Sequence, residues 1–173
     1  MTILIRPFAP DDADAYRVLR LEALRLNPEA FGAAFEDEAA REPASFTPGL
    51  AAPPPSLVLG AWWPDDPAPL GMAGLYADRG RKLAHRGHVW GVYVREAARR
   101  HGIARRLTLR LLDAARAAPL DVLLLSVTAD LAGPRALYES LGFVAHGVEP
   151  AGLKLGPGDY RDMVLMAFDL RPS

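Results

Sequence analysis

The stretch that most constrains the fold covers residues 87–106, GHVWGVYVREAARRHGIARR, where an apolar run leads through a basic loop into a helix. The valines and aromatic residues of 87–94 favour a β-strand. After the loop, the spacing of Ile103, Leu107 and Leu111 predicts a helix. The first N–H groups of a helix have no partner within it and carry the positive end of its dipole, so they attract anions. Gly102, which has no Cβ, lets a bulky anion approach these groups closely.

Arginines on both sides of the loop strengthen this interpretation, because a guanidinium offers fork-shaped donors that suit phosphate oxygens. These arginines are Arg99, Arg100, Arg105 and Arg106. The loop contains neither the G-x-x-x-x-G-K-[ST] pattern of a nucleotide-triphosphatase loop nor the G-x-G-x-x-G pattern of a dinucleotide site. The sequence therefore predicts a phosphate seat of another kind at the start of the helix.

The spacing of the loop resembles R/Q-x-x-G-x-G/A, the signature of the GCN5-related N-acetyltransferase (GNAT) family, with Arg99, Gly102 and Ala104 in the fixed positions. A second block some thirty residues later, LYESLGF at 137–143, resembles another motif of that family, L-Y-x-x-x-G-F. Two motifs in the family's order point to it more strongly than either motif alone.

The second block departs from the family pattern at two positions. Leu131 stands where many members carry asparagine, and Pro134 where many carry alanine. A leucine cannot replace the hydrogen bonds of an amide. Either the loop is held in another way or the affinity for the cofactor is lower.

Apolar runs separated by proline, glycine and asparagine predict a mixed order of elements. Strands are expected at 2–7, 56–63, 70–77, 87–94, 121–128, 143–148 and 160–170, and helices at 12–26, 36–42, from 103 until Pro119, and at 134–141. The segment 43–55 is expected to be a proline-rich loop and 152–159, GLKLGPGD, a glycine-rich loop. This order is typical of the α/β (α+β) class. The resemblance implies one domain over 1–173, with a mixed, mostly antiparallel central sheet of six to seven strands flanked by about four helices.

Alternation along the strand 87–94 predicts which side chains share a face. His88, Trp90, Val92 and Val94 would lie on one face, and Val89, Gly91 and Tyr93 on the other. This assignment decides which of them can reach a ligand.

The resemblance implies acetyl-CoA as co-substrate. Its extended pantetheine would bind the exposed backbone of the strand end, and its pyrophosphate the N–H groups of the loop. The cofactor-binding residues are then expected to be Val92, Tyr93, Val94, Arg99, Arg100, His101, Gly102, Ile103, Ala104 and Arg105.

Two residues are candidates for proton transfer. In the family, the tyrosine at the position of Tyr138 lies near the cofactor sulfur and donates a proton to the departing thiolate, a role that suits a phenol. The alternative for Tyr138 is a core residue. His88 falls in the register where some members carry a catalytic glutamate and the arylalkylamine enzymes a histidine, so it is a candidate base, although it could equally be a structural residue of the sheet. Glu36 and Glu38 are the next candidates, with solvated helix surface as their alternative.

The acceptor is expected to meet Phe31, Phe35, Glu36 and Tyr160, although core packing and a solvated acidic surface explain these residues as well. The acids near Phe35 slightly favour a cationic amine. The main hypothesis is transfer of an acetyl group to a primary amine of a small molecule or a peptide N-terminus, by direct attack in a ternary complex. The alternative is a non-catalytic acyl-CoA-binding regulatory module, which the leucine at 131 favours. The family often dimerises, so a homodimer is compatible with the sequence.

Composition excludes several other classes. The formal net charge is −1 and the pI is near 6.4, which gives no general attraction to nucleic acid or to an anionic membrane. The chain has no cysteine, so it has no thiolate metal site. His85, His101 and His146 have no metal-ligand spacing, and no metal is expected. The first residues lack the apolar core of a signal peptide, and a cytoplasmic protein is expected.

Overall fold

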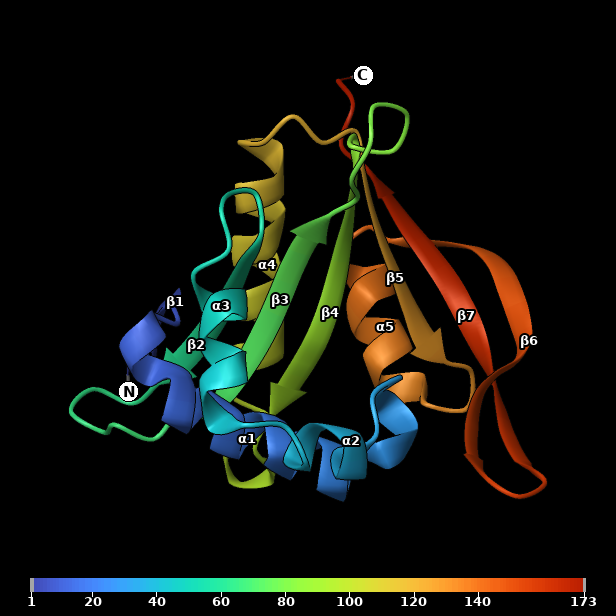
Figure 1. Ribbon diagram of the computed structural model, residues 1–173. Helices are drawn as coiled ribbons and strands as arrows, with labels where there is room; N and C mark the ends of the chain where they lie inside the picture. Colours follow the sequence, from blue (N-terminus) through green and yellow to red (C-terminus); the bar gives the residue numbers. More distant parts are fainter. Residues whose placement is uncertain (1, 173) are drawn as a thin grey trace.

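The computed structural model describes residues 2–172, whose strands form a single seven-stranded sheet in the order β1-β2-β3-β4-β5-β7-β6 (Figure 1). The strands are β1 (Leu4–Pro7), β2 (Leu57–Trp62), β3 (Gly71–Ala77), β4 (Arg86–Val94), β5 (Val122–Thr128), β6 (Val144–Gly156) and β7 (Asp159–Asp169). Every neighbouring pair is antiparallel except β4 and β5, which are parallel. The predicted class, a mixed and mostly antiparallel sheet of six to seven strands, is confirmed.

Five α-helices and four short 3₁₀ turns accompany this sheet in the described part of the chain. They are α1 (Ala13–Leu26), α2 (Phe35–Ala39), α3 (Thr47–Leu50), α4 (Ile103–Arg116) and α5 (Ala132–Ser140), with η1 (Pro10–Asp12), η2 (Pro28–Ala30), η3 (Pro43–Phe46) and η4 (Glu96–Ala98). The predicted loop at 43–55 therefore contains η3 and the single turn α3, and the predicted helix 36–42 is shorter and begins one residue earlier.

Each face of the sheet has its own apolar core. Helix α4 packs on β2, β3 and β4, and its residues Leu107 and Leu111, one helical turn apart, are fully buried there. On the opposite face, Leu19 and Ala23 of α1 are buried against the other side of the same strands. Figure 1 shows α4 behind the sheet and α1 to α3 across its lower front.

Strands β4 and β5 are neighbours at their start and separate toward their carboxyl ends. Their paired residues end at His88, which faces Leu124, and from there β5 continues as a partner of β7. In Figure 1 the two arrows diverge downward and α5 lies between them. The last residues of β4 are therefore paired on the β3 side only among the described strands.

A bulge at Gly91 changes the faces of β4. Trp90 pairs with Gly74 while Tyr93 pairs with Met72, so β4 holds one residue more than β3 over this span. Gly91 takes a φ of +63°, which glycine adopts without a Cβ penalty.

Because of the extra residue, Trp90 and Tyr93 both contact the core on the α1 side, whereas Val89, Val92 and Val94 contact the core on the α4 side. The prediction that His88 and Trp90 share a face with Val92 and Val94 is wrong, since simple alternation holds only along an unbroken strand. A glycine in mid-strand was the one available signal of this break.

The end of the sheet differs from the prediction in a second way. The expected strand 143–148 and glycine-rich loop 152–159 are a single long strand, β6, and only Pro157 and Gly158 lie between it and β7. Three irregularities in register interrupt the pairing of β6 with β7. Glycine has a low intrinsic preference for strands. Here the hydrogen bonds to β7 outweigh that preference, and bulges accommodate the glycines.

Candidate active site

A cavity of about 560 Å³ lies where β4 and β5 diverge. One wall is the end of β4 with Val92, Tyr93 and Val94, and another is α5 with Tyr138. Ala104, in the first turn of α4, and Phe31, which follows η2, also line the cavity. Segments that are far apart in the sequence thus meet at the gap in the sheet.

The loop before α4 has the backbone shape of an anion seat. Arg100 and Gly102 both have left-handed φ values, +65° and +70°, and a Cβ on Gly102 would meet only open space. Left-handed residues next to a helix start orient successive N–H groups to one side, where they form a concavity for anions. The ring of His101 is held by the carbonyls of Ala98 and Arg99, 3.2 and 2.9 Å from its Nδ1. The loop therefore fits a pyrophosphate group.

The arginines around this loop lie in different directions. Arg99 donates from Nε to the carbonyl of Val94 at 3.1 Å, which is a backbone oxygen expected to meet pantetheine. Arg105 donates to the hydroxyl of Ser140 in α5 at 2.8 Å, so it spans the entrance between the two helices. Arg106 donates to the carbonyl of Ile3 at 3.0 Å and therefore lies on the β1 side of α4, away from the seat.

The other predicted cofactor contacts differ in accessibility. The side chain of Ile103 is buried in the core, so only its backbone can meet a ligand, and Arg100 is exposed. Leu131, which replaces the expected asparagine, lines the cavity as an apolar side chain.

Tyr138 lies in the wall of the cavity and is buried, with 6% of its surface exposed. Its ring packs edge-to-face on Phe143 at a centroid distance of 5.7 Å. Burial raises the pKa of its hydroxyl well above the ordinary value of 10. The phenol consequently keeps its proton at neutral pH and can act as a donor.

His88 lies outside the lining of this cavity and has its own partners. Its Nε2 is 3.0 Å from Oδ2 of Asp78, and its ring is stacked on Tyr76 at 4.6 Å. The close approach of the His88 imidazole, aided by the charge of Arg86, lowers the pKa of the Asp78 carboxyl. His88 and Trp90 line a separate cavity of about 400 Å³ on the sheet. Asp78 was not identified from the sequence, although it follows the strand that pairs with His88.

A third cavity, of about 290 Å³, gathers three of the four residues predicted to meet the acceptor. Phe31, Phe35 and Glu36 line it together with Lys154 of β6. Phe31 also lines the cavity with Tyr138, so it separates the two spaces. Tyr160 is half exposed and is not part of this lining, but the ammonium of Lys154 lies 5.6 Å from its ring centre.

Glu38, a candidate base in the sequence, is committed to an ion pair. Arg20 donates to its two carboxylate oxygens at 2.8 and 3.0 Å, and both side chains are largely buried. The guanidinium also lies over the rings of Phe31 and Trp90 at 5.5 and 5.6 Å. The alternative of a solvated surface carboxylate is therefore wrong for Glu38.

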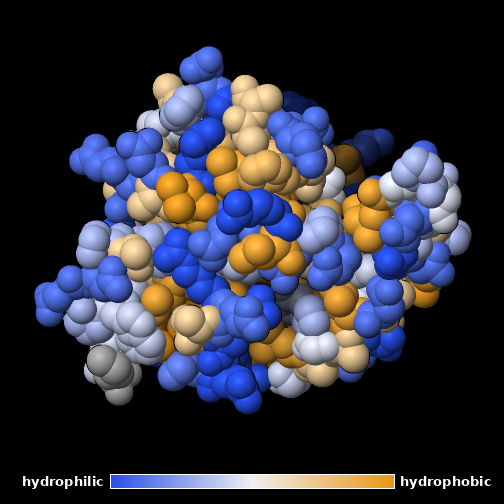
Figure 2. Space-filling model, turned by 90° about the horizontal axis from the view of Figure 1, so that it is seen from below, coloured by the Kyte–Doolittle hydropathy of each residue, from blue (hydrophilic) through white to orange (hydrophobic). Residues whose placement is uncertain are grey.

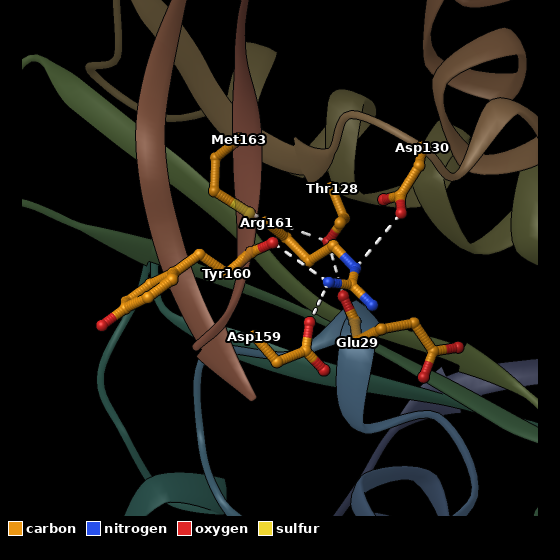
Figure 3. A network of polar contacts seen from close by, with 7 residues as sticks. All are labelled: Glu29, Thr128, Asp130, Asp159, Tyr160, Arg161 and Met163. Carbon is orange, nitrogen blue, oxygen red and sulfur yellow. Dashed lines mark hydrogen bonds and ion pairs between the residues drawn. The ribbon is translucent and has the colours of Figure 1, made fainter. Parts of the chain in front are cut away.

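A polar network joins the mouth of the cavity to the β6–β7 hairpin (Figure 3). The buried hydroxyl of Thr128, at the end of β5, donates to the backbone carbonyl of Glu29 in η2. Nearby, Arg161 of β7 pairs with Asp130 at 3.2 Å and with Asp159. Sequence analysis missed Thr128 and Glu29, because the two residues are 99 positions apart and belong to no motif.

The face that carries α1 and α2 is polar with scattered apolar side chains (Figure 2). Among residues 2–172, no group of three or more histidines and acids is arranged to hold a metal ion. No helix within the same range is long and apolar enough to cross a membrane.

Several solved structures resemble the chain over almost its whole length. An acetyltransferase of the GNAT family from Streptococcus pneumoniae is 21% identical, with a TM-score of 0.84, and the match covers 97% of this chain and 99% of that one. YncA from Salmonella typhimurium, solved with its cofactor acetyl-CoA, is 22% identical, with a TM-score of 0.84 and coverage of 100% and 96%. A ribosomal-protein-alanine N-acetyltransferase from Brucella melitensis is 24% identical, with a TM-score of 0.75 and coverage of 96% and 99%. At these identities the likeness shows the fold alone.

No curated protein matches the sequence. The family model described as "Acetyltransferase (GNAT) family" matches residues 18–143, which is most of the chain and includes both the loop before α4 and the tyrosine of α5. The chain therefore belongs to the GNAT family of acetyltransferases, whose co-substrate is acetyl-CoA.

Proposed function

We propose that this protein transfers the acetyl group of acetyl-CoA to a primary amine of a small molecule or a peptide N-terminus. The observation that carries the proposal is the cavity at the gap between β4 and β5, which brings the free strand end, the loop of Gly102 and the hydroxyl-bearing Tyr138 together. Acetyl-CoA supplies the acetyl group as a thioester, and the amine attacks its carbonyl carbon while the thiol leaves. Holding both reactants side by side provides most of the catalysis.

Tyr138 is proposed to donate its proton to the departing sulfur. Its raised pKa keeps the hydroxyl protonated, and its position in the cavity wall places a donor among the groups that would hold the cofactor. The backbone of Val92 and Val94 is proposed to bind pantetheine, for which Arg99 has to release the carbonyl of Val94. Exchange of one hydrogen-bond partner for another requires only a rotation of an exposed side chain.

His88 is proposed to receive a proton from the ammonium form of the acceptor through water, because it lies outside the lining of the cavity that holds Tyr138. The charged Asp78 next to its Nε2 supports this role, because a carboxylate stabilises the imidazolium that forms. His88 lines a cavity other than that of Tyr138, so the two groups would act from different sides of the bulge.

A non-catalytic acyl-CoA-binding module is the second candidate, and the leucine at 131 in the cavity wall favours it. Both candidates predict that CoA raises the melting temperature. They differ in turnover, which is measured as release of free thiol from acetyl-CoA with a panel of primary amines.

We expect one or more amines to be acetylated, and Tyr138→Phe to lower kcat by about 100-fold or more while the Kd of CoA stays within about twofold. His88→Ala, tested beside it, is expected to lower kcat at neutral pH, where the acceptor is still an ammonium, and to have less effect as the pH approaches the pKa of the amine. Stabilisation by CoA without turnover of any amine would favour the binding module. A protein that does not bind CoA would contradict both candidates.

A further inference from the structure

We propose that the carboxylate of Glu29 binds the ammonium group of the acceptor inside the cavity that holds Tyr138. This inference rests on the proposed function and identifies the residue that selects a cationic amine. It concerns a residue that sequence motifs did not indicate.

Glu29 is the only acidic residue that lines the cavity at the gap between β4 and β5. The one basic residue of that lining, Arg99, already donates to Val94 and, at 3.4 Å, to the side chain of Asn27. Among residues 2–172, Glu29 therefore supplies the one negative charge of this lining. An ammonium in this space gains a charge-assisted partner that no neighbouring side chain of the lining offers.

The backbone of Glu29 is held firmly in place. Its carbonyl accepts the hydrogen bond from the buried hydroxyl of Thr128, and proline precedes it at the start of η2, where the fixed φ of the ring restricts the chain. Two further backbone bonds, from Ala30 to Asn27 and from Phe31 to Pro28, close the turn. The Cα of Glu29 therefore has a fixed position, and only the side-chain torsions of the residue remain free to move the carboxylate.

The carboxylate itself is available. Only the carbonyl of Glu29 takes part in the network drawn in Figure 3, and within residues 2–172 the side-chain oxygens form no hydrogen bond or ion pair. Glu38, by contrast, is bound by Arg20, and Glu36 lies in the neighbouring cavity beyond Phe31. Asp130 and Asp159, drawn in the same network, are paired with Arg161. Among the acids named here, Glu29 alone combines a place in the lining of the cavity that holds Tyr138 with an uncommitted charge.

The test compares Glu29→Gln with Glu42→Gln, a matched removal of one negative charge from an exposed position that lines neither cavity. With an amine that the wild type acetylates, we expect Glu29→Gln to raise KM for the amine at least about tenfold, as fits the loss of a charge-assisted hydrogen bond. The Kd of CoA, measured by calorimetry, should be unchanged and so report an intact fold and cofactor seat. Glu42→Gln should change KM for the amine by less than about twofold.

A second measurement separates recognition of charge from loss of shape. The trimethylammonium analogue of the accepted amine and its neutral tert-butyl isostere are compared as inhibitors. The trimethylammonium group has no N–H, so this comparison reports Coulomb attraction alone. The wild type is expected to prefer the cation at least about tenfold, and Glu29→Gln is expected to lose that preference.

The outcomes distinguish failure of the role of Glu29 from failure of the proposed acetyltransferase function. Normal KM and a retained preference for the cation in Glu29→Gln would overturn the role of Glu29 and leave the acetyltransferase function intact, as would an equal effect of Glu42→Gln. Absence of turnover by the wild type with every amine would instead remove the proposed function, and the role of Glu29 with it.

Discussion

At the scale of single residues, burial and neighbouring charges determine whether each titratable side chain keeps its proton. Tyr138 is buried and retains its proton, since removal of solvent disfavours the phenolate. Asp78 lies beside His88 and Arg86, and its lowered pKa keeps it charged. These two environments differ in the way that the proposed proton donor, Tyr138, and the partner of the proposed base, His88, require.

The ion pair between Arg20 and Glu38 is expected to matter for stability more than for chemistry. Glu38→Ala leaves the guanidinium buried without its carboxylate, and we expect a loss of about 3 kcal/mol in the free energy of unfolding. Urea denaturation measures this loss. Glu36→Ala, which removes an exposed carboxylate from the same short helix, serves as control and should change stability by less than about 0.5 kcal/mol. Equal effects of the two substitutions would contradict the assignment.

Thr128 is expected to position η2 through its single hydroxyl. Thr128→Val keeps the shape but removes the donor, so the carbonyl of Glu29 loses its partner, at a cost of about 1–2 kcal/mol in stability. We also expect a higher KM for the amine. Thr128→Ser retains the hydroxyl and should restore the KM, measured by the same thiol assay. A serine variant as impaired as the valine variant would show that the methyl group, not the hydrogen bond, is what counts.

At the scale of elements, the bulge in β4 determines which side chains meet the cavity. Gly91→Ala places a Cβ where φ is +63°, and its nearest heavy neighbour would be Arg20 at 3.6 Å, so strain without a clash is expected, about 1 kcal/mol. Gly74→Ala in β3 is expected to cost more, because its Cβ would overlap the indole of Trp90. Thermal unfolding of both variants checks this order, and the reverse order would count against the described bulge.

Elements whose pattern is local were predictable from the sequence. The helix α4 begins after Gly102 and shows a clear apolar stripe, so the prediction from 103 to the residues before Pro119 agrees with Ile103–Arg116. Strand β6 was cut short in the prediction, because its residues form a strand only through pairing with β7. Likewise, the faces of Trp90 and Val92 depend on one extra residue that alternation cannot reveal.

The residues of the candidate site likewise fall into two groups, those that belong to sequence motifs and those that only the fold brings into place. Ala104 and Tyr138 belong to motifs that the sequence shows, and both line the cavity at the gap between β4 and β5. Asp78, Thr128 and Glu29 acquire their places through contacts between strands or across the sheet, and a single sequence gives no such contact. Their roles therefore required the folded structure.

At the scale of the whole molecule, buried tyrosines link stability to alkaline pH. Burial raises the pKa of Tyr16 to about 12 and that of Tyr138 further, whereas both titrate near 10 in the unfolded chain. The unfolded state then releases protons first, so their stabilising contribution is complete below pH 10 and decreases as the pH rises toward 12. Each tyrosine contributes a slope of about 1.4 kcal/mol per pH unit in that window. Urea titrations at pH 8 to 11.5 measure it, with Tyr16→Phe expected to reduce the slope by its share.

The connection between Thr128 and Glu29 also bears on how the protein matures during synthesis. The turn η2 leaves the ribosome early, but the hydroxyl that holds it follows 99 residues later, and Arg161 and β7 later still. A nascent chain that ends before β5 contains the phosphate loop of α4 without a completed acceptor side. The core of α4 also includes Leu123 of β5 and Met166 of β7, so the loop and the acceptor side complete their packing only when the carboxyl-terminal hairpin has been synthesised.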